Sequence, residues 1–267
     1  MKEAPARHVV AVGSGKGGVG KSTISLNTAL ALVERGAKVG LLDADFYGPD
    51  IPLMLGLKQT RPLERWGLWR AGGMRLEPVE RFGLRVMSVG FMLAEQQALA
   101  WPGQMVEFVG RQLVHDVEWG ELDYLVIDLP PGTADVQQQL VRLLPLAAFP
   151  LVVSPQDVAH LDAKRLWEML TSERVRILGA IENMRGLLCP HCGGHVEVFP
   201  EVSEKRSLWR LGVERLGELP LDPALTVGGD RGQPVVVGAP ESAPAEAFRA
   251  LAGRVVRELE QPPLTDA

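Results

Sequence analysis

Gly15-Lys16-Gly17-Gly18-Val19-Gly20-Lys21-Ser22-Thr23 is the stretch that decides the fold of this chain. It follows an apolar run at residues 8–12 and opens a helical pattern at residues 21–35, which stops at Gly36. A glycine-rich loop between a strand and a helix lets backbone N–H groups surround a phosphate, and the positive end of the helix dipole faces the same anion. The spacing G-x4-G-K-S in this setting therefore predicts a P-loop that binds ATP.

Short apolar runs alternate with helical patterns along the rest of the chain. The runs end at small or acidic residues and cover residues 38–42, 84–89, 124–127, 149–153 and 177–181. Helical patterns cover residues 105–117, 136–144 and 161–170. Continuous apolar strands separated by helices are typical of a parallel sheet that is buried on both faces. We therefore predict an α/β fold with a doubly wound, mostly parallel sheet and helices on both faces.

One P-loop ATPase domain, residues 1–267, is the predicted domain organisation. A chain of 267 residues with 46% hydrophobic residues has enough apolar material for one large core. Residues 58–81 and residues 187–209 lack a regular period, and we interpret both as excursions from the sheet. We expect the tail after residue 260 to be frayed.

Composition argues against several classes of partner and location. The net charge is −5 and no dense run of Lys or Arg is present, so nucleic acid is not expected as a partner. A local basic group at Arg61, Arg65 and Arg70 is more simply a solvated loop. No apolar segment follows the charged N-terminus as in a signal peptide, and no run reaches the ~20 residues of a membrane span. We expect a soluble, cytoplasmic protein that binds no membrane.

The loop residues have distinct expected roles in binding MgATP. Residues 15–23 as a whole are expected to contact the nucleotide, with Lys21 neutralising the β- and γ-phosphates and the Ser22 hydroxyl binding Mg²⁺. Lys16 lies on the far limb of the loop from Lys21, where a cation is able to reach phosphates bound by a facing subunit, as an arginine finger does. The alternative for Lys16 is a solvated side chain.

Three aspartates follow predicted strands at the same edge of the sheet. Asp128 ends the run at residues 124–127 and matches a Walker-B aspartate, which holds Mg²⁺ mainly through water. Residues 130–135 would then form a switch loop that senses the γ-phosphate. Asp43 is expected to support the Mg²⁺ shell, and Asp45 to orient the attacking water. The alternatives are an Asp128 that merely ends its strand and an Asp45 that merely forms a turn.

Cys189-Pro190-His191-Cys192 is a second cluster of chemically active residues, and it contains both cysteines of the chain. Thiolates in such a loop are soft ligands for iron or zinc. The spacing alone leaves four interpretations open: zinc shared between subunits, a bridging iron–sulfur cluster, a redox pair and purely structural cysteines. His191 and His195 are expected to be solvated rather than ligands.

At this point the motifs carry a resemblance to known proteins. Residues 16–23 resemble the deviant Walker A loop of the MinD/ParA class of dimeric ATPases. More narrowly, the chain resembles the Mrp/ApbC-type iron–sulfur cluster carriers. The matching stretches appear in family order at residues 42–49 (LDADFYGP), 127–133 (IDLPPGT), 154–158 (SPQDV), 182–184 (ENM), 189–192 (CPHC) and 229–232 (GDRG).

This resemblance implies a homodimer that binds a bridging [4Fe–4S] cluster and passes it to recipient apo iron–sulfur proteins. Cys189 and Cys192 of each subunit would bind the cluster, with zinc possible in its place. Four thiolates are the usual ligand set of such a cluster, and one CxxC supplies only two. The resemblance also implies that Lys16 crosses the dimer interface and that Asn183 contacts the adenine base.

The sequence departs from the family pattern at several positions. Residues 197–205 (EVFPEVSEK) replace a glycine-rich loop, Asp50 replaces a serine, Ala134 replaces a glycine, and the run at residues 101–105 is altered. None of these changes removes an expected ligand of phosphate, Mg²⁺ or the cluster. They bear on the conformational coupling between the two sites.

Two other functions compete with this interpretation. A MinD/ParA-like positioning or partition ATPase with structural zinc would need a membrane-binding helix or a basic DNA face. The predicted helix at residues 243–260 places Phe248, Leu251 and Val255 on one face, which is more typical of a helix that packs on the core. An ATP-dependent ligase would need a substrate pocket, and the sequence indicates none.

Overall fold

The computed structural model describes residues 4–57, 76–92, 103–132, 135–189 and 191–261. One set of strands contains β1 (His8–Val12), β5 (Tyr124–Asp128), β2 (Val39–Asp43) and β4 (Leu84–Ser88) in parallel, with β3 (Val79–Arg81) antiparallel at the edge. A second set contains β6 (Phe149–Val153), β7 (Ile177–Asn183) and β10 (Arg215–Leu219), all parallel.

Strands β1 and β6 join the two sets into one continuous surface. Parallel bridges link Val10 to Ala148 and Gly13 to Leu151, and the Val152 N–H donates to the Gly13 carbonyl at 2.9 Å. All five residues of β2 and of β6 are buried, as expected for strands covered on both faces. The predicted α/β fold with a mostly parallel sheet is confirmed.

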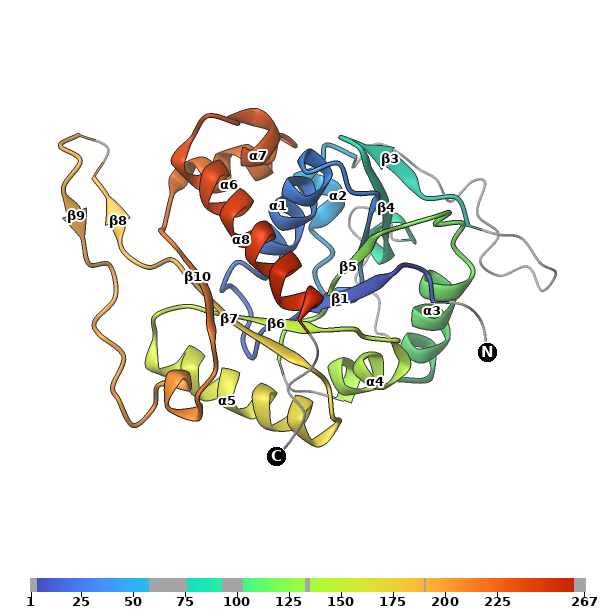
Figure 1. Ribbon diagram of the computed structural model, residues 1–267, viewed down its shortest axis with the longest axis horizontal. Helices are drawn as coiled ribbons and strands as arrows, with labels where there is room; N and C mark the ends of the chain where they lie inside the picture. Colours follow the sequence, from blue (N-terminus) through green and yellow to red (C-terminus); the bar gives the residue numbers. More distant parts are fainter. Residues whose placement is uncertain (1–3, 58–75, 93–102, 133–134, 190, 262–267) are drawn as a thin grey trace.

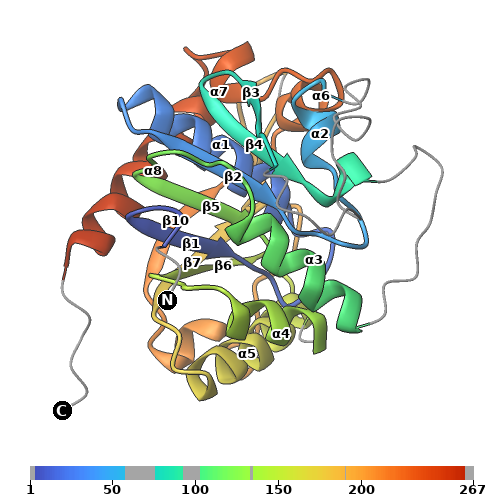
Figure 2. The same ribbon diagram turned by 90° about the vertical axis from the view of Figure 1, so that its right-hand side faces the viewer.

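Helices cover both faces of this sheet (Figures 1 and 2). One face carries α1 (Lys21–Glu34) and α8 (Ala243–Glu260), and the other carries α3 (Gly103–His115), α4 (Asp135–Leu143) and α5 (Asp157–Ser172). The predicted end of α1 is correct: Gly36 has φ 87°, a left-handed conformation that glycine adopts without strain, and its N–H donates to the Val33 carbonyl.

Several short elements were not predicted as such. They are α2 (Ile51–Met54), η2 (Val89–Met92), η3 (Leu208–Leu211), α6 (Pro223–Asp230) and α7 (Val235–Gly238), together with strands β3 and β10. Strand β10 has the sequence RLGEL with only Leu216 and Leu219 buried, so it shows no apolar run. Parallel pairing with β7, rather than local pattern, makes this segment a strand.

The excursion predicted at residues 187–209 contains a hairpin that projects from the body of the molecule (Figure 1). Its strands are β8 (Leu187–Leu188) and β9 (His195–Val196), which pair antiparallel. Several predicted features lie outside the described residues. They are most of the excursion at residues 58–81, the basic group at residues 61–70, Trp101, Ala134 and most of the tail after residue 260. Among the described helices, none has the length and apolar character to span a membrane.

Candidate nucleotide site and cysteine hairpin

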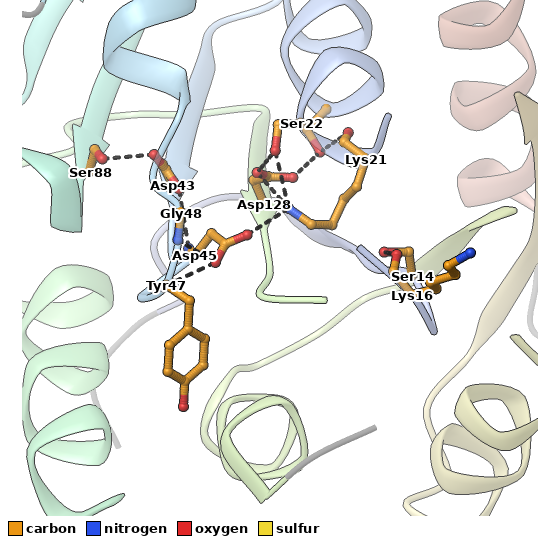
Figure 3. A network of polar contacts seen from close by, with 11 residues as sticks. Ser14, Lys16, Lys21, Ser22, Asp43, Asp45, Tyr47, Gly48, Ser88 and Asp128 are labelled. Carbon is orange, nitrogen blue, oxygen red and sulfur yellow. Dashed lines mark hydrogen bonds and ion pairs between the residues drawn. The ribbon is translucent and has the colours of Figure 1, made fainter. Parts of the chain in front are cut away.

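The P-loop and the predicted aspartates meet at the carboxyl ends of neighbouring strands (Figure 3). The register pairs Val12 of β1 with Asp128 of β5, and Asp128 with Asp43 of β2. The P-loop continues from β1, so its residues lie at the same sheet edge as both carboxylates. Ligands of parallel α/β sheets bind at this edge.

Close approach of other chain segments and left-handed backbone conformations explain why three loop positions are glycine. A Cβ at Gly15 would collide with the backbone of Asp162 in α5, and a Cβ at Gly20 would collide with the Asn183 amide. Gly18 and Gly20 also have φ values of 79° and 86°, which side chains rarely adopt. The loop is therefore fixed between α5 and the end of β7.

Lys21 is buried and folded back onto Asp128. Its Nζ lies 2.8 Å from Asp128 Oδ2, which also accepts a hydrogen bond from Ser22 Oγ at 2.7 Å. Asp128 is fully buried, and its Oδ1 accepts from Ser25 Oγ at 2.7 Å. The same three residues predicted to bind phosphate and Mg²⁺ thus bind one another in this conformation.

The carboxylates control the charge state of Lys21. Burial lowers the pKa of Lys21. The negative charges of Asp128 and then Asp45 raise it, and together with the hydrogen bond to Asp128 they outweigh burial, so the pKa lies above its ordinary value. The ammonium group is held as a cation next to the helix N-terminus.

Asp43 makes two hydrogen bonds that the sequence did not indicate. Both of its oxygens are engaged away from Lys21: Oδ2 accepts from Ser88 Oγ at 2.8 Å, and Oδ1 accepts from the Asp45 N–H at 3.1 Å. Complete burial, and then the nearby Asp128, raise its pKa well above the usual range. A role for Asp43 in the Mg²⁺ shell stays a prediction.

Asp45 forms the turn that was its alternative role, and its other oxygen faces Lys21; its role in orienting the attacking water stays a prediction. Its Oδ1 accepts from the N–H groups of Tyr47 and Gly48 at 3.2 and 3.1 Å, which forms a turn, while Oδ2 lies 3.4 Å from Lys21 Nζ. Burial raises the pKa of Asp45, and Lys21 opposes that shift. The turn fixes the carboxylate so that one oxygen faces the position of Lys21.

Lys16 and Lys21 lie on different sides of the loop (Figure 3). Lys16 Nζ is 3.4 Å from Gln156 Oε1 at the start of α5, and its backbone carbonyl accepts from Ser14 Oγ at 3.0 Å. This agrees with the expected separation of the two cations. Its action on a partner's nucleotide stays a prediction.

Asn183 is directed at the P-loop. Its Nδ2 donates to the Val19 carbonyl at 2.8 Å, and only 4% of the residue is exposed. The amide therefore fixes the loop backbone in this conformation, a function that the sequence did not indicate. Contact with an adenine base stays a prediction that rests on the family resemblance.

The cysteines lie on the projecting β8–β9 hairpin. The Cys189 N–H donates to the Gly194 carbonyl at 2.8 Å, and the Gly193 N–H donates back to the Cys189 carbonyl at 2.8 Å, which closes a tight turn. Cys192 is exposed and Cys189 is half-buried. Backbone N–H groups, first that of His191 and then that of Cys192, lower the pKa of Cys189, and a thiolate is the form that binds metals.

Two site residues were missed by sequence reasoning. Ser25 follows Lys21 by one helical turn, so both side chains lie on the face of α1 that looks at Asp128, and this spacing was a usable signal. Ser88 ends β4 opposite Asp43, a contact that depends on the register of β2 and β4. Local sequence carries no signal for the second contact.

The chain matches a family model described as NUBPL iron-transfer P-loop NTPase, of the ParA type, over residues 5–256. It is 42% identical to the iron–sulfur cluster carrier protein of Helicobacter pylori over 255 residues, which are 96% of this chain and 68% of that protein. It is 40% identical to the mitochondrial iron–sulfur protein required for NADH dehydrogenase of Arabidopsis thaliana over 256 residues, which are 96% of this chain and 80% of that one.

Solved structures give the same fold. A nucleotide-binding protein of Archaeoglobus fulgidus in complex with ADP has a TM-score of 0.73 and 34% identity, covering 91% of this chain and 93% of that chain. The septum site-determining protein MinD of Pyrococcus horikoshii, with Mg-ADP, has a TM-score of 0.68 and 23% identity, covering 93% and 95%. The second likeness shows the fold alone.

Proposed function

The chain belongs to the NUBPL iron-transfer family of P-loop NTPases, and on this premise we propose that it is a cytoplasmic, homodimeric ATPase that carries an iron–sulfur cluster to recipient apo iron–sulfur proteins. The P-loop ATPase class predicted from the sequence is confirmed by the family. The observation that carries the proposal is the presence of two separate devices in one chain: a nucleotide loop around Lys21 and an exposed cysteine hairpin.

In the proposed mechanism, ATP binding replaces the internal contacts of the P-loop. The ammonium of Lys21 leaves Asp128 Oδ2 for the β- and γ-phosphates, and the Ser22 hydroxyl leaves the same oxygen to face the metal. Asp128 would then hold Mg²⁺ through water. When bound, Mg²⁺ supplies positive charge that neutralises the phosphate oxygens.

Asp45 and Lys16 complete the proposed hydrolysis. Asp45 is held by its turn with one oxygen beside Lys21, which supports a role in orienting a water near the terminal phosphate. Lys16 lies apart from Lys21, beside Gln156, and would reach the nucleotide of a second copy. Charge stabilisation in trans would couple hydrolysis to dimer formation.

The cysteine hairpin would bind the cluster as cargo. A single chain supplies two thiols, and in the described part of the chain no group of three His, Cys, Asp or Glu side chains gathers as a metal site. A four-thiolate cluster therefore requires a second hairpin, which is the physical argument for a cluster shared across a homodimer. A [4Fe–4S] cluster fits this ligand number; zinc with the same four thiolates is the competing occupant.

The proposal is tested by separating the two devices. In Cys189→Ala with Cys192→Ala, anaerobic reconstitution should give no iron and no visible absorption band, while calorimetry should show MgATP binding as in the wild type. Lys21→Ala should do the reverse: iron is bound, and nucleotide is not. His191→Ala is the matched control in the same hairpin and should retain iron.

Three results would contradict the proposal. The first is iron binding that survives loss of both cysteines, and the second is loss of both ligands in either variant. The third is reconstituted protein that holds zinc but no iron when both metals are offered, which would favour a nucleotide switch with structural zinc. That alternative predicts a membrane-binding helix or a basic DNA face. Burial of Phe248, Leu251 and Val255 of α8, at 0%, 3% and 4% exposure, argues against the first of these two features.

A further inference from the structure

The end of β7 carries two adjacent polar side chains that serve different parts of the molecule. Successive side chains of a strand point to opposite faces, so Asn183 and Glu182 face different layers. Asn183 holds the Val19 carbonyl of the P-loop. Glu182 is 1% exposed and has no contact with the P-loop among the bonds of the described residues.

Glu182 instead gathers a group of cations and donors. Its Oε2 lies 3.3 Å from Nη1 of both Arg185 and Arg215, and its Oε1 lies 3.5 Å from His160 Nε2. His160 Nδ1 accepts the Leu208 N–H at 3.0 Å, so in the neutral ring the proton sits on Nε2 and faces the carboxylate. One buried carboxylate thus ties β7, α5, β10 and η3 together.

The chain bends sharply directly after this carboxylate and leads into the cysteine hairpin. Met184 and Gly186 have φ values of 65° and 67°, and the Arg185 N–H donates to the Leu219 carbonyl at 2.9 Å. A Cβ at Gly186 would collide with the His195 imidazole of β9, so the hairpin base packs directly on the bend. Only two residues separate Gly186 from Cys189 in the sequence.

The two arginines have room to change partners. They border a cavity of about 370 Å³ whose wall includes Glu182 and Trp209. The side chains of Arg185 and Arg215 are 39% and 43% exposed, and the Arg215 guanidinium stacks 4.2 Å above the Trp209 ring. The bend is therefore held by charge around Glu182 and not by tight packing alone.

From this arrangement we propose that Glu182 is a positioning residue that holds the bend after β7. A movement of the P-loop, which Asn183 follows through its bond to Val19, is thereby transmitted to the cysteine hairpin. The inference rests on the proposed function and names the residues through which nucleotide and cluster sites communicate. Binding of MgATP would replace the side-chain contacts of Lys21 and Ser22 with Asp128, and phosphate bonds to the N–H groups of the loop would move the backbone around Val19. Asn183 follows the loop through Val19, and the fixed bend carries that movement to residues 187–196.

The two cysteines give a direct reporter of this communication. Because the chain contains no other cysteine, the rate of alkylation by iodoacetamide in reduced, metal-free protein reports on the hairpin alone. In the wild type we expect saturating MgATP to change this rate about fivefold or more, the lower end of measured coupling between sites. In Glu182→Gln the ratio of the alkylation rates with and without MgATP should be about one, while MgATP binding and dimer mass stay as in the wild type.

Matched variants separate positioning from general damage. Glu218→Gln removes the other, exposed carboxylate partner of Arg215 and should keep the wild-type ratio. Arg185→Ala removes a half-exposed partner of Glu182 while Arg215 still neutralises the carboxylate, and it should lose the ratio even where Glu182→Gln fails to fold. Circular dichroism checks folding in each case.

Several outcomes would overturn the inference: an unchanged ratio in Glu182→Gln or in Arg185→Ala, an equal loss in Glu218→Gln, or loss of the dimer together with the ratio. A wild-type rate that ignores MgATP would also overturn it, since there would be no signal to carry. The carrier function is judged separately by iron loading of the same samples. If iron loads normally but MgATP does not change the alkylation rate, the positioning role of Glu182 is refuted and the carrier function is not.

Discussion

Ser25→Ala tests the geometry of the nucleotide site at a residue that has no expected contact with ATP. Ser25 Oγ donates to Asp128 Oδ1 at 2.7 Å, and both residues are fully buried. The substitution removes this donor and leaves Oδ1 without it, while Lys21 and Ser22 still bond to Oδ2. The unliganded protein should therefore be less stable, without a change of fold.

The magnitude follows from the charge of the acceptor. A hydrogen bond to a charged group contributes about 1.5–3 kcal/mol, and water cannot replace the donor at a buried site. We expect a loss of about 2 kcal/mol in the free energy of unfolding. For a chain of this size, about 2–4 °C in Tm accompanies each kcal/mol, so Tm should fall by about 4–8 °C.

Urea unfolding without nucleotide, followed by circular dichroism, measures this loss. Thr28→Val is the matched control on the same helix, because within the described residues its buried hydroxyl has no hydrogen-bond partner. Removing an unpaired buried hydroxyl should leave stability unchanged or raise it by up to about 1 kcal/mol. Equal losses in the two variants, or a loss below about 0.5 kcal/mol in Ser25→Ala, would refute the reasoning.

Three further predictions concern single residues of the site. Burial and Asp128 raise the pKa of Asp43. The contribution of this group to stability is therefore full below the usual aspartate pKa and is lost as the pH rises through the higher folded pKa. In urea unfolding measured against pH, Asp43→Asn should be more stable than the wild type at neutral pH and equally stable in acid. Lys16→Gln should keep MgATP binding in calorimetry but lower ATP turnover by about 10³-fold, as for a charge supplied in trans, and unchanged turnover would count against that role. Gly20→Ala should weaken nucleotide binding and cost about 1–2 kcal/mol of stability, because φ is 86° and the new Cβ meets the Asn183 amide; wild-type behaviour in both assays would contradict the described loop.

Much of the fold was predictable because its signals are local. The strand before the P-loop, the helix after it and the stop at Gly36 each depend on a few neighbouring residues, and all three are present. Strand β10 was not predictable, because its identity comes from pairing with β7, a segment about 35 residues earlier in the chain.

The site was predictable in its members but not in its internal contacts. Lys21, Ser22 and Asp128 were identified from spacing, whereas their mutual bonding is a property of the assembled sheet edge. The bond of Asp43 to Ser88 was not predictable, because the register of β2 and β4 decides which side chains meet. The same holds for Asn183, whose contact with Val19 joins residues 164 positions apart.

The most direct test of the proposed carrier is the composition of anaerobically reconstituted protein, measured as iron per chain together with mass by light scattering. The account predicts a dimer with about two iron atoms per chain, because four thiolates from two hairpins hold one [4Fe–4S] cluster. Cys189→Ala with Cys192→Ala should contain no iron in the same preparation. A monomer that holds its full iron content, or a dimer whose iron does not depend on the two cysteines, would contradict the account.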